Sequence, residues 1–158
     1  MADKINQPSD YFKSDEYGLE VKLAWKNTFG KDRTQLFKDA QSFVDRECIS
    51  LMVPYTPMLN GILMKSPVLG TDIGSGHIYY LSPYARYQYY GKLMVSSITG
   101  SAYASMGEKK VLTNVDLVHN KEGKHQQAGP FWFERMKKEK GAQILKGAAK
   151  YAGGTPIG

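Results

Sequence analysis

The sequence predicts a small α+β domain, with a mostly antiparallel β-sheet, two main α-helices packed on one face of it, and long loops. Three observations support this prediction. Short runs alternate between apolar and polar residues, longer segments repeat apolar residues at helical spacing, and stretches rich in glycine and proline separate them. The order of strand, helix, several strands and helix is typical of the α+β class.

The length and composition fit a single domain. The chain has 158 residues, of which 42% are hydrophobic and 23% charged, which suffices for one core. We expect an α+β core over residues 18–151, a flexible acidic arm over residues 1–17 and a disordered tail over residues 152–158. Cys48 is the only cysteine, and no apolar run reaches the ~18 residues of a membrane span. These features favour a soluble, cytosolic protein without disulfides.

The first elements of the core are predicted to be a strand and a long helix. Alternation over residues 19–25 indicates a half-buried strand. Asp32, followed by Gln35 three residues later, is typical of a helix N-cap, and the helical spacing of apolar residues continues to Met52. Cys48 lies on the apolar face of this helix, which favours a core thiol over a nucleophile. The outer face is predicted to carry Lys38, Asp39, Gln41, Ser42, Asp45 and Arg46.

The middle of the chain alternates loops with short elements. Pro54 and Pro57 end the helix, because proline disfavours helical geometry in the residue before it and lacks a backbone donor. A long loop is then predicted over residues 53–76, with a short apolar run at 62–64 that could be a strand. It is followed by a strand at 77–81 and a helix start or tight turn at 82–90. A second loop at 93–108 leads to a strand at 110–118.

The last predicted element is a basic helix. A third exposed loop covers residues 119–129, and Pro130 is suited to the first turn of a helix because its missing N–H is not needed there. Apolar residues recur along this helix at Phe131, Trp132, Phe133, Met136, Ile144, Leu145, Ala148 and Ala149.

The charge is unevenly distributed along the chain. The formal net charge is +6, but residues 1–20 hold two lysines against five acidic residues, whereas residues 129–158 hold six basic residues against two acidic ones. One interpretation is that opposite charges at the two ends orient head-to-tail contacts between copies. The other is a solvated tail and an ordinary basic helix face. The total net charge, taken alone, would also suit a nucleic-acid partner.

The sequence offers no anchor for an enzyme. His77, His119 and His125 are the only histidines, and their spacing matches no metal-binding motif. The glycines of residues 70–76 are not followed by the Lys-Ser/Thr pair of a phosphate-binding loop. We therefore expect no catalytic residue, no metal and no cofactor. An enzyme of unknown type would need a pocket with converging polar groups, which a sequence does not reveal.

Tyrosines are concentrated in one segment. Six of the eleven lie within residues 77–91. Tyrosine suits surfaces buried against another protein, because it joins a large apolar face to a polar tip. With Arg86 and Lys92 nearby, the cluster could instead stack on bases, but adjacent tyrosines must point in different directions, which disfavours a stacking platform. Protein contact or core packing is the favoured interpretation. The six are Tyr79, Tyr80, Tyr84, Tyr87, Tyr89 and Tyr90.

Four landmarks, taken together and in order, resemble the minor capsid or tail-completion proteins of long-tailed bacteriophages. The match runs from about Leu19 to about Lys150, and the tyrosine motif is its most specific part. The landmarks are Ala40-Gln41 with Asp45; Pro57, Gly61, Leu63 and Ser66; Ser82, Pro83, Tyr84, Ala85, Arg86, Tyr87, Tyr89, Tyr90 and Gly91; and Gly129, Pro130, Trp132 and Phe133 before a basic helix.

The resemblance implies a non-enzymatic virion protein of the neck, where the DNA-filled head joins the tail. Proteins of this group are small α+β subunits that form rings, commonly sixfold. The implied partners are further copies of the chain, the head-completion or stopper protein, the tail terminator and the tail tube, with packaged DNA passing through the lumen and no membrane. The implied location is the head–tail junction of the virion, and the host cytoplasm during assembly. Lys137, Lys138 and Lys140 would face an acidic partner or the DNA path.

Two departures from the family pattern leave the position within the neck open. Leu59-Asn60 stands where many relatives have an acidic residue and threonine, and Tyr89 stands where many have glutamate. The alternative function is a small basic protein that binds nucleic acid through its tyrosine, lysine and arginine side chains. Its binding would weaken steeply with salt, whereas a protein ring seated on a tail would persist.

Overall fold

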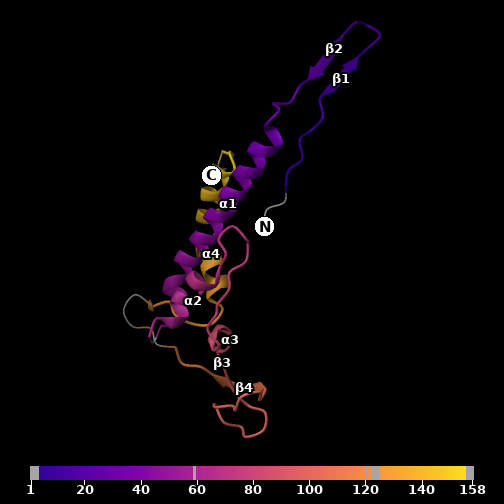
Figure 1. Ribbon diagram of the computed structural model, residues 1–158. Helices are drawn as coiled ribbons and strands as arrows, with labels where there is room; N and C mark the ends of the chain where they lie inside the picture. Colours follow the sequence, from indigo (N-terminus) through magenta and orange to yellow (C-terminus); the bar gives the residue numbers. More distant parts are fainter. Residues whose placement is uncertain (1–3, 59, 120, 122–124, 156–158) are drawn as a thin grey trace.

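The computed structural model describes residues 4–58, 60–119, 121 and 125–155. These residues form helices and two short β-hairpins, arranged along one extended axis (Figure 1). Residues 1–3, 59, 120, 122–124 and 156–158 lie outside the described part. They include Leu59 and the outer ends of the predicted arm and tail. The elements in order are β1 (Tyr11–Ser14), β2 (Glu20–Leu23), α1 (Phe29–Met52), the 3-10 turn η1 (Val53–Tyr55), α2 (Ile62–Gly70), α3 (Ala85–Tyr90), β3 (Lys92–Ser96), β4 (Lys110–Asp116) and α4 (Trp132–Tyr151).

The body of the molecule is the pair α1 and α4, which run antiparallel (Figure 1). At one end of the pair, Arg33 near the start of α1 donates to the carbonyl of Ala152, just after α4. Further along α1, the ring of Phe43 stacks on Tyr151, the last residue of α4, with centroids 4.8 Å apart. At the opposite end a core of buried side chains joins both helices to the segments between them. That core contains Cys48, Met52, Tyr55, Leu63, Ala85, Trp132, Met136 and Ile144.

A close approach of the two helices depends on Gly147. A Cβ atom built at this position would lie 2.3 Å from the ring of Phe43. Only glycine therefore lets the aromatic ring lie directly against the backbone of α4.

The hairpin of β1 and β2 projects beyond the first turn of α1 (Figure 1). Its strands pair antiparallel, with Tyr11 opposite Leu23 and Lys13 opposite Val21. All eight strand residues are exposed. The segment predicted as a flexible arm thus contributes a strand, which pairs with β2, within the strand predicted at 19–25. The prediction that this second strand is half-buried was wrong, because the hairpin projects away from the helix pair and its strand residues are exposed.

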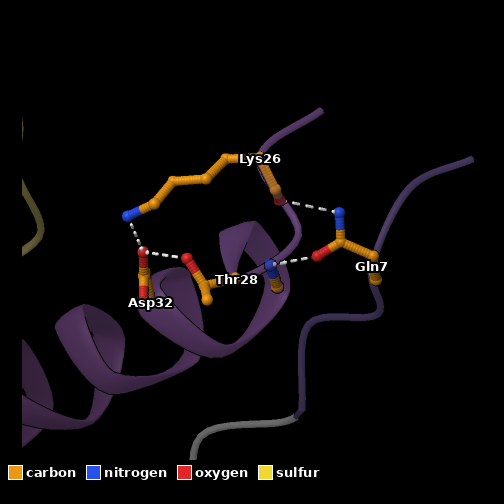
Figure 2. A network of polar contacts seen from close by, with 5 residues as sticks. Gln7, Lys26, Thr28 and Asp32 are labelled. Atoms are coloured by element: carbon orange, nitrogen blue, oxygen red, sulfur yellow. Dashed lines mark hydrogen bonds and ion pairs between the residues drawn. The ribbon is translucent and has the colours of Figure 1, made fainter. Parts of the chain in front are cut away.

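Polar contacts fasten the N-terminal segment to the start of α1 (Figure 2). The Gln7 amide donates to the carbonyl of Lys26 and accepts the N–H of Gly30, each at 3.0 Å. Asp32 forms an ion pair with Lys26 at 3.0 Å and accepts a hydrogen bond from the Thr28 hydroxyl at 2.9 Å. These two bonds hold the pKa of the Asp32 carboxyl below its usual value.

The prediction that Asp32 is the N-cap was wrong. The helix begins at Phe29 with Thr28 as N-cap, and Asp32 lies in its first turn. There its carboxylate is engaged by side chains that precede the helix, and it is also placed favourably at the positive end of the helix dipole.

The α+β class, the two main helices and the antiparallel pairing are confirmed, but the layer arrangement differs from the prediction. Strands form two separate two-stranded sheets, and the main helices pack on each other rather than on one face of a common sheet. The physical reason is that α1 and α4 each present an apolar stripe, and each stripe is buried by the other helix.

Individual elements of the middle segment also differ. The apolar run at 62–64 begins helix α2, and residues 77–81 have no strand partner. Strand β3 occupies the start of the loop predicted at 93–108, because it pairs with β4, the strand predicted at 110–118. The segment after Ser82-Pro83, predicted as a helix start or tight turn, forms helix α3. The prediction that Pro130 lies in the first turn of the last helix was wrong, because Phe131 is the N-cap and α4 begins at Trp132. Within the described residues, no helix combines the length and the apolar character needed to cross a membrane.

Candidate functional site

Two of the predicted landmarks, the tyrosine motif and the Gly-Pro-x-Trp segment, meet at the end of the helix pair where α1 finishes and α4 begins. The ring of Tyr89, on α3, lies edge-on to Trp132 with centroids 4.7 Å apart and planes at 89°. Tyr80 contacts the same indole at 5.4 Å. Phe131 packs against Tyr89 and Tyr90 at 5.6 and 5.9 Å. Edge-to-face pairs of this kind contribute beyond their buried area, so these rings form one packed unit, here named the aromatic cluster.

Backbone geometry aligns α3 with α4. The N–H of Phe131 donates to the carbonyl of Tyr89 at 2.8 Å. Phe131 itself has φ of 50°, and no other non-glycine residue in the described part of the chain has a positive φ. Gly91 ends α3 in the left-handed conformation, and a Cβ there would lie 2.8 Å from Pro130. The Tyr-Gly and Gly-Pro-x-Trp landmarks therefore fit together through positions that few residues tolerate.

An open pocket of about 540 Å³ lies beside the aromatic cluster. Its walls are mostly aromatic and aliphatic, and the ionisable side chains other than tyrosine on its lining are Arg86 and His77. No carboxylate lines it among the described residues. The pocket is lined by Met52, Gly76, His77, Ile78, Tyr80, Ala85, Arg86, Tyr89, Tyr90, Trp132 and Phe133.

A second pocket of about 400 Å³ involves the other proline–glycine landmark. Pro57 and Leu63 line it together with Tyr84 and His119. Burial lowers the pKa of the His119 imidazole, and its Nε2 is buried with no hydrogen-bond partner among the described residues. Ser66 lies nearby in the chain, and its hydroxyl accepts the N–H of Ser82 at 3.0 Å, which ties α2 to the start of the tyrosine motif.

Arg135 connects the start of α4 to the segment that precedes it and to η1, which follows α1. Its guanidinium donates to three carbonyls, those of Pro130 at 3.0 Å, Gln127 at 2.7 Å and Tyr55 at 3.3 Å. It also lies over the Tyr55 ring, 5.6 Å from the centroid. The Tyr55 hydroxyl donates to Glu139 at 2.7 Å. These contacts give Arg135 a structural role that its position in a basic helix did not indicate.

Two hydroxyls of the cluster, those of Tyr80 and Tyr89, have a raised pKa. Tyr89 donates to the Glu134 carboxylate, and burial together with this hydrogen bond raises the pKa of Tyr89 well above its usual value. Burial also raises the pKa of Tyr80, whose hydroxyl contacts the sulfur of Met52 at 3.8 Å. At neutral pH both side chains therefore act as hydrogen-bond donors and packing groups.

The structure separates the tyrosine motif into a buried and an exposed part. Ala85 and Gly91 are buried, Tyr84, Tyr87 and Tyr89 are half-buried, and Pro83, Arg86 and Tyr90 are exposed. Tyr87 packs under the Lys110 ammonium, 5.1 Å from the ring centroid. The motif is thus partly core and partly available surface. Of the other landmark residues, Pro57, Gly61, Leu63, Ser66 and Trp132 are buried, and Pro130 and Phe133 are half-buried.

The three lysines predicted to face a partner lie on α4. Lys137, Lys138 and Lys140 are all exposed, and none is within ion-pair distance of a carboxylate in the described part of the chain. They lie on the helix that begins in the aromatic cluster, but the pocket is not lined by any of them.

The prediction that Asp45 lies on the outer face of its helix was wrong. The side chain is buried, with 2% of its surface exposed. Its carboxylate accepts the N–H groups of Gly74 at 2.7 Å and Gly76 at 3.2 Å, and the amide of Gln41 at 2.8 Å. Its burial is possible because the loop of residues 70–76, here named the glycine loop, lies against α1 there and supplies hydrogen-bond donors. No local pattern signalled this burial, because the donors Gly74 and Gly76 lie 29 and 31 positions further along the chain.

The described residues contain no group of three or more His, Cys, Asp and Glu side chains placed to hold a metal ion. His125 is used internally, with Nδ1 3.0 Å from the carbonyl of Thr56. Cys48 is buried in the core, as predicted, and burial raises the pKa of its thiol. What the arrangement offers chemically is an aromatic surface with one exposed arginine, which is suited to binding.

Comparison of the chain with protein-family models, with curated proteins and with solved structures finds no match.

Proposed function

We propose that this chain is a structural subunit of the bacteriophage neck, which completes or terminates the tail and joins it to the head as part of a ring, without catalysis. The observation that carries the proposal is the ordered set of four landmarks, above all the run from Ser82 to Gly91. Its partners would be further copies of itself and the adjoining neck and tail proteins. DNA would pass through the lumen of the ring.

The convergence of the landmarks supports this proposal. Residues 82–91 and 129–133 are about forty positions apart in the chain, yet Tyr89 and Trp132 are in direct contact. A motif that forms one packed unit with exposed aromatic edges suits a subunit whose work is to hold neighbours. Tyr90, 44% exposed beside Phe131, is such an edge.

The test is deletion of the reading frame from the genome that carries it, followed by electron microscopy of the lysate. We expect DNA-filled heads and separate tails, and joined particles when the intact gene is supplied on a plasmid. Normally joined, infectious particles without the gene would refute the proposal, as would a genome that lacks portal, capsid and tail-tube genes beside it.

A point variant separates assembly from folding. Tyr90→Ala removes an exposed ring edge and should leave a folded protein that no longer supports head–tail joining. The matched control is Tyr103→Ala, a tyrosine that is 89% exposed and belongs to none of the four landmarks, which should complement fully. If Tyr90→Ala unfolds the protein, Tyr90 is a core residue and its interface role fails.

A further inference from the structure

We propose that the tip of the β1–β2 hairpin inserts Tyr17 into the aromatic pocket of a second copy of this chain. This inference rests on the proposed ring-forming function and deepens it, because it names the segment and the surface by which one copy holds the next. Four observations lead to it: the presentation of Tyr17, the lining of the pocket, the charges on the two surfaces, and the distance that separates them within one chain.

Tyr17 is presented to solvent on a well-defined turn. It is 87% exposed. The Asp15 carboxylate accepts the N–H of Tyr17 at 3.0 Å and that of Leu19 at 2.8 Å, and Gly18 turns the chain with φ of 81°. Because the turn is internally hydrogen-bonded, little conformational freedom remains to be lost when the tyrosine binds.

The pocket has the shape and lining that an aromatic side chain requires. Its volume of about 540 Å³ lies in the usual range for binding pockets. Tyr80, Tyr89 and the largely buried Trp132 contribute aromatic rings to its wall. A phenol ring inserted there would make the edge-to-face contacts that the cluster already makes within itself.

The charges of the two surfaces are complementary. Asp15, Glu16 and Glu20 flank Tyr17, and residues 15–20 contain no cation. The pocket presents the exposed Arg86 and has no carboxylate on its described lining; the exposed Glu134 carboxylate beside it accepts the hydroxyl of Tyr89. An acidic tip that enters on the Arg86 side of the pocket is therefore attracted and oriented.

The contact cannot form within one chain. The hairpin precedes the first residue of α1, whereas Met52, the last residue of α1, lines the pocket. The 24 residues of this helix span about 36 Å at the standard rise of ~1.5 Å per residue. Figure 1 shows the hairpin and α3 at opposite ends of the molecule. Since tip and pocket are different surfaces, repeated contacts join copies head to tail, the geometry that builds rings when it closes.

The hairpin has a further reason to dock. One of its faces carries Tyr11, Val21 and Leu23, which are between 48% and 53% exposed, together with Lys13, which pairs with Val21. An isolated two-stranded hairpin is marginally stable in water, and exposure of these three apolar side chains is unfavourable. Seating the tip in a neighbour brings this face against protein.

A disulfide trap tests the contact. Glu16→Cys and Arg86→Cys each place one thiol beside the proposed contact, and the native Cys48 is buried. After the two variants are mixed and oxidised, we expect a covalent dimer that contains one copy of each. A chain with both substitutions should give a ladder of oligomers. The control replaces Glu16→Cys with Tyr103→Cys, an equally exposed position, 89% accessible, in another loop.

The result that supports the proposal is a dimer yield at least about tenfold above the control, lost when Tyr17→Ala is added to the Glu16→Cys chain and retained with Tyr17→Phe. Equal yields with the control, or a yield that Tyr17→Ala leaves unchanged, overturns it. Because Tyr17 is a solvent-exposed turn residue, its truncation should leave the fold intact, which circular dichroism checks.

Failure of this contact and failure of the proposed function are distinguishable. If no trap forms while deletion of the gene still leaves heads and tails unjoined, the Tyr17 contact is refuted and the neck function stands. If the trap forms but particles join without the gene, the chain associates head to tail in some other assembly.

Discussion

Replacing Asp45 by alanine should destabilise the protein strongly, although the residue lies outside the pocket. The carboxylate joins α1 to the glycine loop through the N–H groups of Gly74 and Gly76 and also binds Gln41. The alanine variant leaves all three donors without their acceptor in a site that is 2% exposed at residue 45.

The magnitude follows from these contacts. A hydrogen bond to a charged group contributes about 1.5–3 kcal/mol when the partner is removed and the other group stays buried. Gly74 is half-buried and Gly76 is exposed, so water replaces part of what is lost. We expect the free energy of unfolding to fall by about 2–4 kcal/mol for Asp45→Ala. Asp45→Asn keeps one oxygen that can accept the N–H groups of the loop, and the Gln41 amide can rotate to accept a hydrogen bond from the new NH₂ group. The free energy of unfolding of this variant should therefore fall by only about 1 kcal/mol.

The assay is chemical denaturation, combined with hydrogen exchange at the amides of Gly74 and Gly76. Both amides should exchange faster in Asp45→Ala, because the loop loses its anchor. The control is Asp39→Ala, on the exposed side of the same helix, where the carboxylate accepts a hydrogen bond from the Gln35 amide at 2.9 Å. Its effect should stay within about 0.5 kcal/mol. If Asp45→Ala is no worse than this control, or if Asp45→Asn is equally damaging, the account of the loop anchor is wrong.

Three further predictions concern packing and ionisation. Gly147→Ala should lower the melting temperature, despite alanine's higher helix propensity, because the new Cβ would lie 2.3 Å from the Phe43 ring. Adding Phe43→Leu should recover part of the lost melting temperature. An unchanged melting temperature in Gly147→Ala would contradict the close approach. Because the pKa of His119 is lowered in the folded protein, its imidazole takes up a proton at higher pH in the unfolded state than in the folded state. The free energy of unfolding should therefore decrease as the pH falls below about 6.5. A series of denaturation curves at different pH should show a shallower decrease for His119→Gln than for the native protein. Cys48 should react with thiol reagents orders of magnitude more slowly in the native protein than in denaturant, and rapid native labelling would refute its burial.

The helices were predictable because their signals are local. The spacing of apolar residues marked α1 and α4 within a few residues, and Pro54 and Pro57 marked the end of the first. The start of α1 was missed because Thr28 and Asp32 are both typical capping residues, and only their contact shows which one caps. The run at 62–64 was ambiguous, since a short apolar segment fits a strand as well as a helix.

The candidate site was predictable as a set of residues but not as an arrangement. The tyrosine motif and Trp132 stood out by composition and by resemblance, and the structure brings them into contact. The roles of Asp45 and Arg135 were not apparent, because each depends on backbone groups contributed by distant segments. A polar residue on a helix has the same local pattern whether a loop covers it or water does.

The sequence by itself determined the α+β class, the two amphipathic helices, the core position of Cys48 and the opposite charges of the two ends. All of these follow from residue type and local spacing. Only the tertiary structure decided that the helices cover each other, that Asp45 is buried under a glycine loop, and that the acidic hairpin and the aromatic pocket lie about a helix length apart. The physical reason is that these features depend on which surfaces meet across the chain, and burial, unlike periodicity, is a property of the assembled fold.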